Sequence, residues 1–97
     1  MKLNHSELNT TIHLINLLIQ CQQIEYIMIQ ENNFQCFYYA DDSKCELIGI
    51  EYEDLTCGEE PEHNFIIIQV SEPYDVIPFC IKDIDSIVIK LKDGKIL

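Results

Sequence analysis

The chain has 97 residues, 47% of them hydrophobic, and its 17 Asp and Glu against 6 Lys and no Arg give a net charge of -11. This length predicts a single domain over residues 1–97, and the apolar content excludes a disordered chain. Proteins that bind nucleic acids neutralise phosphates with clustered Lys and Arg, so the charge disfavours direct binding of DNA or RNA. It also disfavours anionic membranes and predicts a basic protein partner.

The cysteines and the N-terminus indicate the compartment. Five cysteines, an odd number without a C-x-x-C pair, are typical of small, buried apolar side chains in a reducing cytoplasm. The first nine residues, MKLNHSELN, lack the apolar core of a signal peptide, and no apolar run is long enough for a membrane helix. We therefore expect a cytoplasmic protein without a membrane segment.

Residues 1–23 predict a helix. Asn4 is a good N-cap residue, and Glu7 three positions later completes an approximate capping box. Apolar side chains then recur at helical spacing to about Gln22: Leu8, Ile12, Leu14, Ile15, Leu17, Leu18, Ile19 and Cys21. A helix with so narrow a polar stripe must be covered on more than one side. Two alternatives remain for what covers this helix: a concave sheet of the same chain, or the Leu8–Cys21 helix of a second copy in a homodimer.

Residues 24–97 predict an antiparallel meander or barrel of short strands. β-Branched and aromatic runs alternate with turn residues, giving expected strands at 24–30, 34–40, 44–53, 65–70, 76–81 and 86–92. The alternation slips at Gly49, which predicts a bulge, and Pro78 predicts an edge strand. Asp93–Gly94 predicts a turn before a short return or frayed tail. The expected class is α+β, with an N-terminal helix packed on a small, strongly bent five- or six-stranded antiparallel sheet or an Sm-like barrel.

Enzymatic chemistry has little support. Cys57 and His63 are the only local nucleophile and base, and the acids around them would raise the pKa of the thiol. A metal site could draw its ligands from Cys45, Cys57 and His63, with Glu59 or Glu62, but their spacing matches no known zinc-binding pattern. We expect no enzyme, no catalytic residues, no metal site and no cofactor, and keep a metal- or thiol-dependent small enzyme as the last alternative.

The aromatic residues Phe34, Phe37, Tyr38 and Tyr39 fall in one expected strand. Such a cluster can stack unpaired bases in RNA-binding sheets, but those platforms are ringed by cations, and none surrounds this cluster in the sequence. Core and cross-strand packing is therefore the expected role.

Nine carboxylates and one lysine, Lys44, lie between Asp41 and Glu62. They form either a solubilising surface or a surface matched to a basic cleft of another protein, where complementary charge speeds encounter and fixes orientation. Aromatic residues contribute strongly to interfaces. The candidate partner-binding residues are Asp41, Asp42, Glu46, Glu51, Glu53, Asp54, Glu59, Glu60 and Glu62, with Tyr38, Tyr39 or Tyr52 as anchors.

Two segments carry a family resemblance. LLIQCQQ at residues 17–23 leads into an apolar strand, and IKDIDSI at residues 81–87 comes late in the chain. With the order of elements, they resemble the Rho-binding antiterminators of the Rof family, which are small Sm-like barrels. The resemblance implies an acidic protein that docks on the basic RNA-binding surface of the termination factor Rho and blocks it. The loop at residues 53–63 is longer than that family leads us to expect, and only the acidic positions are carried over as candidates.

The expected function is a non-enzymatic, cytoplasmic regulator or inhibitor that binds a basic surface of a partner, as a nucleic-acid mimic or a Rho-type antiterminator. Small phage-encoded inhibitors and immunity proteins share this profile. The main alternative is an assembly module in which the helix pairs two copies.

Overall fold

The computed structural model describes residues 7–42, 45–54, 64–71 and 75–97. It confirms the α+β class, with one α-helix, six strands and a short 3-10 helix in the described ranges. In chain order the elements are α1 (Leu8–Gln20), β1 (Ile24–Glu31), β2 (Phe34–Tyr39), β3 (Leu47–Asp54), β4 (Asn64–Val70), β5 (Asp75–Cys80), η3 (Ile81–Asp83) and β6 (Ile84–Leu91).

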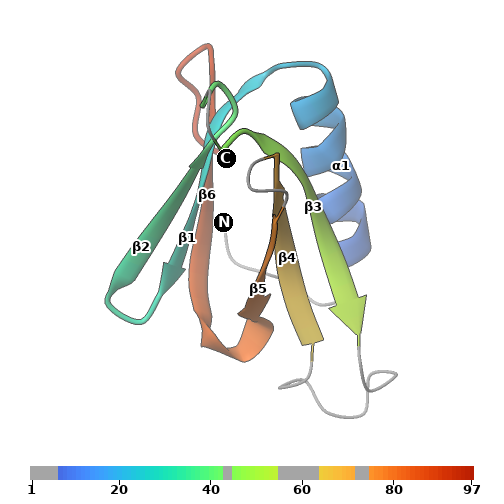
Figure 1. Cartoon of the computed structure of the whole chain (residues 1–97), viewed down its shortest axis with the longest axis vertical. Helices are drawn as coiled ribbons and strands as arrows, with labels where there is room; N and C mark the ends of the chain where they lie inside the picture. The colour runs from blue at the N-terminus through green and yellow to red at the C-terminus, as the bar shows by residue number, and fades with distance from the viewer. Residues whose placement is uncertain (1–6, 43–44, 55–63, 72–74) are drawn as a thin grey trace.

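The strands form two three-stranded antiparallel sheets, ordered β2-β1-β6 and β3-β4-β5. Figure 1 shows the first sheet on the left and the second on the right, with η3 connecting β5 to β6 at the lower end. The last strand, β6, returns to pair with β1. In the described part of the chain the two sheets do not close into a barrel, so the six strands are arranged as two open sheets and not as the Sm-like barrel.

The core lies between the sheets and is almost entirely aliphatic. On β1, Ile27 and Ile29 are fully buried, and their partners on β6 are Ile89 and Ile87, also fully buried. The alternation in the sequence of β6 therefore indicated its buried face correctly. The remaining fully or nearly fully buried members of the core are Leu8, Ile12, Ile15, Ile24, Leu47, Ile50, Ile66, Ile68, Val70, Phe79 and Ile81.

Helix α1 contributes one face to this core and leaves another open. Leu8, Ile12 and Ile15 are buried, whereas Leu14 and Leu17 keep 49% and 44% of their surface exposed. The helix therefore carries more apolar surface than the two sheets cover, and its Leu14–Leu17 side faces solvent.

Asn16 fixes α1 to the free edge of β3. Its side-chain Nδ2 donates to the backbone oxygen of Ile50 at 2.8 Å, and the Ile50 amide donates to Asn16 Oδ1 at 2.9 Å. Because β3 is an edge strand, these backbone groups would otherwise face away from the sheet without a strand partner. The side-chain amide thus makes the hydrogen bonds that a neighbouring strand would make. It blocks this part of the edge, where an unprotected strand could pair with another chain.

Three local predictions are confirmed. The β3–β4 register shifts between Leu47 and Gly49, as the broken alternation indicated. Pro78 lies on β5, an edge strand. After the turn at Gly94, whose φ is 98°, the chain returns to form a bridge between Lys90 and Ile96.

The predicted capping box at the start of the helix depends on Asn4 and stays a prediction. The helix begins at Leu8, and Glu7 before it makes no side-chain capping hydrogen bond. The proposed cap, Asn4, lies outside the described residues.

Candidate protein interface

A pocket of about 300 Å³ lies where α1 and β2 end and β3 begins. It brings together two of the predicted acids, Asp41 and Glu46, which are separated by a turn, and Lys92, which follows β6. Its lining residues are Ile19, Gln20, Gln22, Ala40, Asp41, Glu46, Leu47, Ile48 and Lys92. The pocket is therefore of mixed character, with carboxylates beside aliphatic side chains.

The wall formed by α1 is shaped by how the helix ends. Gln22 adopts a left-handed conformation with a φ of 57°. The Gln22 and Gln23 amides then donate back to the carbonyl oxygens of Ile19 and Leu18, each at 3.0 Å. This is the hydrogen-bond pattern of a Schellman motif, which usually has glycine at the left-handed position. The motif turns the chain from α1 into β1.

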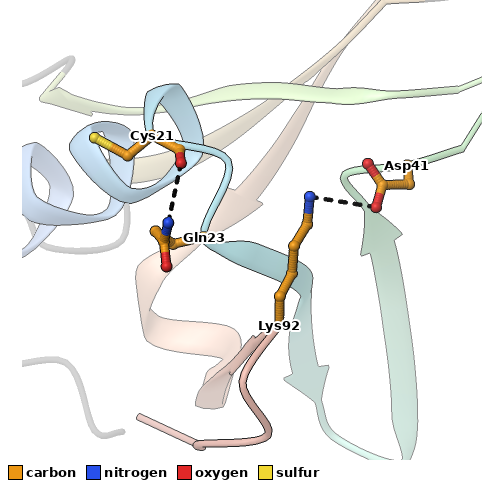
Figure 2. Close-up of polar contacts among 4 residues, drawn as sticks. All are labelled: Cys21, Gln23, Asp41 and Lys92. Atoms are coloured by element: carbon orange, nitrogen blue, oxygen red, sulfur yellow. Dashed lines mark hydrogen bonds and ion pairs between the residues drawn. The ribbon is translucent and has the colours of Figure 1, made fainter.

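Lys92 joins this junction to the end of β2. Its backbone amide donates to Gln23 O at 2.9 Å, and its Nζ lies 3.4 Å from Asp41 Oδ2, as Figure 2 shows. The Asp41 side chain is 77% exposed, so solvent screens the pair, and such pairs contribute about 0–1 kcal/mol. The ion pair thus leaves most of the surface of Asp41 accessible to a partner.

Other predicted acids lie on the outer face of β3. Glu51 and Glu53 are both exposed and stand opposite Ile67 and Phe65 of β4. Neither of them, nor Glu46, forms an ion pair with any residue in the described ranges. The structure therefore divides the acids into a group beside the pocket and a group along β3.

The remaining predicted acids are less informative. Asp42 is exposed, and its Oδ1 accepts a hydrogen bond from the Cys45 amide at 3.2 Å. Asp54 is the last residue of β3. Glu59, Glu60 and Glu62 lie outside the described residues.

The aromatic residues of β2 are largely exposed, so of the expected core and cross-strand packing, Phe37 and Tyr39 show the cross-strand part, against Tyr26 of β1. Phe34, Phe37 and Tyr39 keep 73%, 43% and 46% of their surface. Phe37 and Tyr39 lie with Tyr26 of β1 in a cluster whose ring centroids are 5.3 to 6.3 Å apart. The period-2 alternation of the edge strand places Phe37 and Tyr39 on its outer face. Sequence composition alone does not reveal which face is covered.

The other two predicted anchors lie closer to the core. Tyr38 points inward and meets Phe79 of β5 edge-on, with ring centroids 6.1 Å apart. Burial raises the pKa of Tyr38 to about 12, and the neighbouring Cys36 adds to the shift. Tyr52 is half-buried against the core. Tyr39 is therefore the most accessible of the three tyrosines.

The raised pKa of Tyr38 predicts a loss of stability in alkali. An unfolded tyrosine ionises near its ordinary pKa of about 10, whereas the folded one ionises near 12. The unfolded state therefore gains charge first, and the free energy of unfolding should fall as pH rises from 10 towards 12. Urea unfolding across this range should show a smaller fall for Tyr38→Phe than for the natural chain. An identical fall in both proteins would show that Tyr38 does not cause it.

The cysteines are more accessible than expected. Cys21 is exposed, and Cys36, Cys45 and Cys80 are half-buried, and none of these four described cysteines forms a disulfide. The expectation of buried cysteines is therefore wrong for Cys21, which sits at the end of α1 outside the core.

The catalytic and metal-binding candidates receive no further support. Cys57 and His63 lie outside the described residues. Within the described ranges, no group of three or more His, Cys, Asp or Glu side chains is placed to hold a metal ion.

None of the helices in the described ranges has the length and apolar character needed to cross a membrane. Comparisons of the chain with protein-family models, with curated proteins and with solved structures gave no match.

Proposed function

We propose that this chain is a non-enzymatic regulator or inhibitor, acting in the cytoplasm, that binds a basic surface of a partner protein through its exposed carboxylates. The observation that carries the proposal is the accessibility of Glu46, Glu51 and Glu53, which are exposed and form no ion pair with a described residue. Carboxylates left in solvent remain available for cations of a partner. Complementary charge would speed the encounter and orient the complex.

Basic surfaces that normally bind nucleic acid are the natural targets of such a protein, because an array of carboxylates imitates phosphates. The resemblance to the Rof family suggests one specific version of this function, in which the chain is an antiterminator that occupies the RNA-binding surface of Rho. In that form the purified chain should displace a labelled RNA from Rho. Failure to displace RNA would remove the Rho form but would leave other basic partners open.

Affinity capture from the native host tests the general proposal. The full chain is immobilised, and bound proteins are eluted with increasing NaCl and identified. We expect a specific partner with a basic surface to elute as the salt rises, because ions screen exposed charge pairs. A partner that resists high salt and elutes only with a denaturant would contradict an electrostatic interface.

A second candidate function is homodimeric assembly through α1. The specific observation in its favour is the exposure of Leu14 and Leu17, one turn apart on the open side of the helix. Such i, i+3 pairs form apolar seams between helices.

Sedimentation equilibrium distinguishes this second candidate from the first. If the helix pairs two copies, the natural chain should be dimeric, and the double substitution Leu14→Gln and Leu17→Gln should make it monomeric. A natural chain that remains monomeric at all accessible concentrations would exclude assembly through α1.

A further inference from the structure

Strand β2 lies at the free edge of its sheet and exposes backbone groups that no described residue pairs with. The Ala40 amide donates to Glu25 O at 3.0 Å, and the antiparallel register continues through Tyr38–Ile27 and Cys36–Ile29. Since hydrogen-bonded positions alternate along such a ladder, the residues between them point their N–H and C=O groups away from β1. These outward-facing residues are Gln35, Phe37 and Tyr39.

This edge lacks the usual protection against pairing. Natural edge strands are blocked by lysine, proline, bulges or a covering element. The six residues of β2, FQCFYY, contain neither charge nor proline, and the β1–β2 register runs without a bulge. By contrast, the equivalent edge of β3 is covered by Asn16 of α1. Of these two edge strands, β3 is thus blocked at Ile50, whereas β2 is not covered by any described residue.

Charge around the open edge selects the kind of strand that can join it. Glu31 stands opposite Phe34 at one end of β2, and the exposed Asp41 and Asp42 follow its other end. Lys92 Nζ lies 3.4 Å from Asp41 Oδ2 at that second end. The rings of Phe37 and Tyr39 add faces that attract Lys and Arg side chains. The edge is therefore uncharged along its length, and its two ends together carry three carboxylates against one lysine.

The same charges disfavour a second copy as the occupant. Antiparallel pairing of two β2 strands would place Asp41 and Asp42 of one copy beside the Glu31 end of the other. Parallel pairing would place Asp41 and Asp42 of the two copies together. Like charges facing each other across a strand pair are destabilising.

We propose that β2 is the docking edge for an extended, Lys- or Arg-containing segment of the partner protein, which joins the sheet as an additional strand. This proposal rests on the proposed function, because it takes the basic partner from there and adds a contact at β2, in the other sheet from Glu51 and Glu53 of β3. Backbone hydrogen bonds to Gln35, Phe37 and Tyr39 would give affinity. Alternate cationic side chains over the Tyr26, Phe37 and Tyr39 cluster would give selectivity.

The test uses the full chain with a synthetic probe, the peptide acetyl-Lys-Thr-Lys-Val-Lys-Thr-Lys-amide, at low ionic strength. Two analogues carry N-methyl groups on alternate residues, one on the odd and one on the even positions. All three peptides have the same charge and side chains. A strand pairs through the amides of every second residue, so methylation should block one analogue and spare the other.

We expect the parent peptide and one analogue to bind equally, and the other analogue to bind on the order of tenfold more weakly, or about 1.4 kcal/mol. Bound peptide should slow hydrogen exchange at the Gln35, Phe37 and Tyr39 amides. Equal binding of all three peptides would overturn docking at the edge but leave the electrostatic function standing. Failure of every peptide to bind would count against both the docking at the β2 edge and the electrostatic function.

A matched pair of variants tests the protein side. Gln35→Pro removes one outward N–H, at a place where an edge strand tolerates proline, and Gln35→Ala keeps it. The parent peptide should bind the alanine variant as it binds the natural chain and bind the proline variant more weakly. Protection of the β2 amides without peptide, together with a dimer in sedimentation, would overturn the proposal in favour of a second copy.

Discussion

Replacing Ile68 with alanine should lower the free energy of unfolding by about 2–5 kcal/mol, the usual cost of removing a buried Ile side chain beyond Cβ. Ile68 is fully buried at the middle of β4, the central strand of its sheet, and pairs with Ile50 on one side and Ile77 on the other. Neighbours held by strands on both sides cannot move in to fill the cavity. Domains of this size are stable by about 5–15 kcal/mol, so the loss is a large fraction of the total.

Urea unfolding followed by circular dichroism measures this effect. Ile48→Ala is the matched control, because Ile48 belongs to the neighbouring strand β3 and keeps 42% of its surface exposed. The control should change stability much less than Ile68→Ala. Equal losses from the two substitutions would mean that the core does not lie between the two sheets.

Asn16→Ala should destabilise the protein by about 1–3 kcal/mol, because it leaves partly buried backbone groups without partners. The side chain of Asn16 both donates to and accepts from the backbone of Ile50. Alanine favours the helix itself by some tenths of a kcal/mol, which opposes part of the loss. Asn9→Ala controls for this gain, since Asn9 is an exposed residue of the same helix.

The difference between the two asparagine variants isolates the contacts with β3. Hydrogen exchange adds a local measurement, because the Ile50 amide should exchange faster in Asn16→Ala and unchanged in Asn9→Ala. Equal stability of the two variants, with the Ile50 amide still protected, would show that the side-chain amide does not hold α1 on the strand edge.

Local sequence patterns predicted the elements well because their causes are local. Alternation located β6 and its buried face, Pro78 indicated an edge strand, and the slip at Gly49 indicated the bulge. Each of these follows from the period of a strand or from the chemistry of one residue.

The arrangement of the strands could not be predicted in the same way, because it depends on pairing between distant segments. Nothing local in β6 specifies β1 as its partner. The role of Asn16 was likewise hidden, since an asparagine in a helix looks like any other polar position until a strand edge lies beside it.

The candidate interface was predicted as a list of acids and tyrosines but not as a surface. Charge density identified Asp41 and Glu46, yet their meeting in one pocket requires the turn between β2 and β3. The cross-strand packing of Phe37 and Tyr39 was predicted, but not which face of β2 stays exposed, because an aromatic strand has the same composition on a covered and an uncovered face.

The central claim is that the position of the carboxylates, and not net charge alone, determines binding of a basic partner. It is tested most directly by the dissociation constant of the captured partner for two variants that each lose three negative charges. One carries Glu46→Gln, Glu51→Gln and Glu53→Gln, and the other Glu7→Gln, Asp83→Asn and Asp85→Asn. We expect the first to weaken binding at low salt by at least about tenfold and the second to stay close to the natural chain. Equal dissociation constants for the two variants would contradict the account.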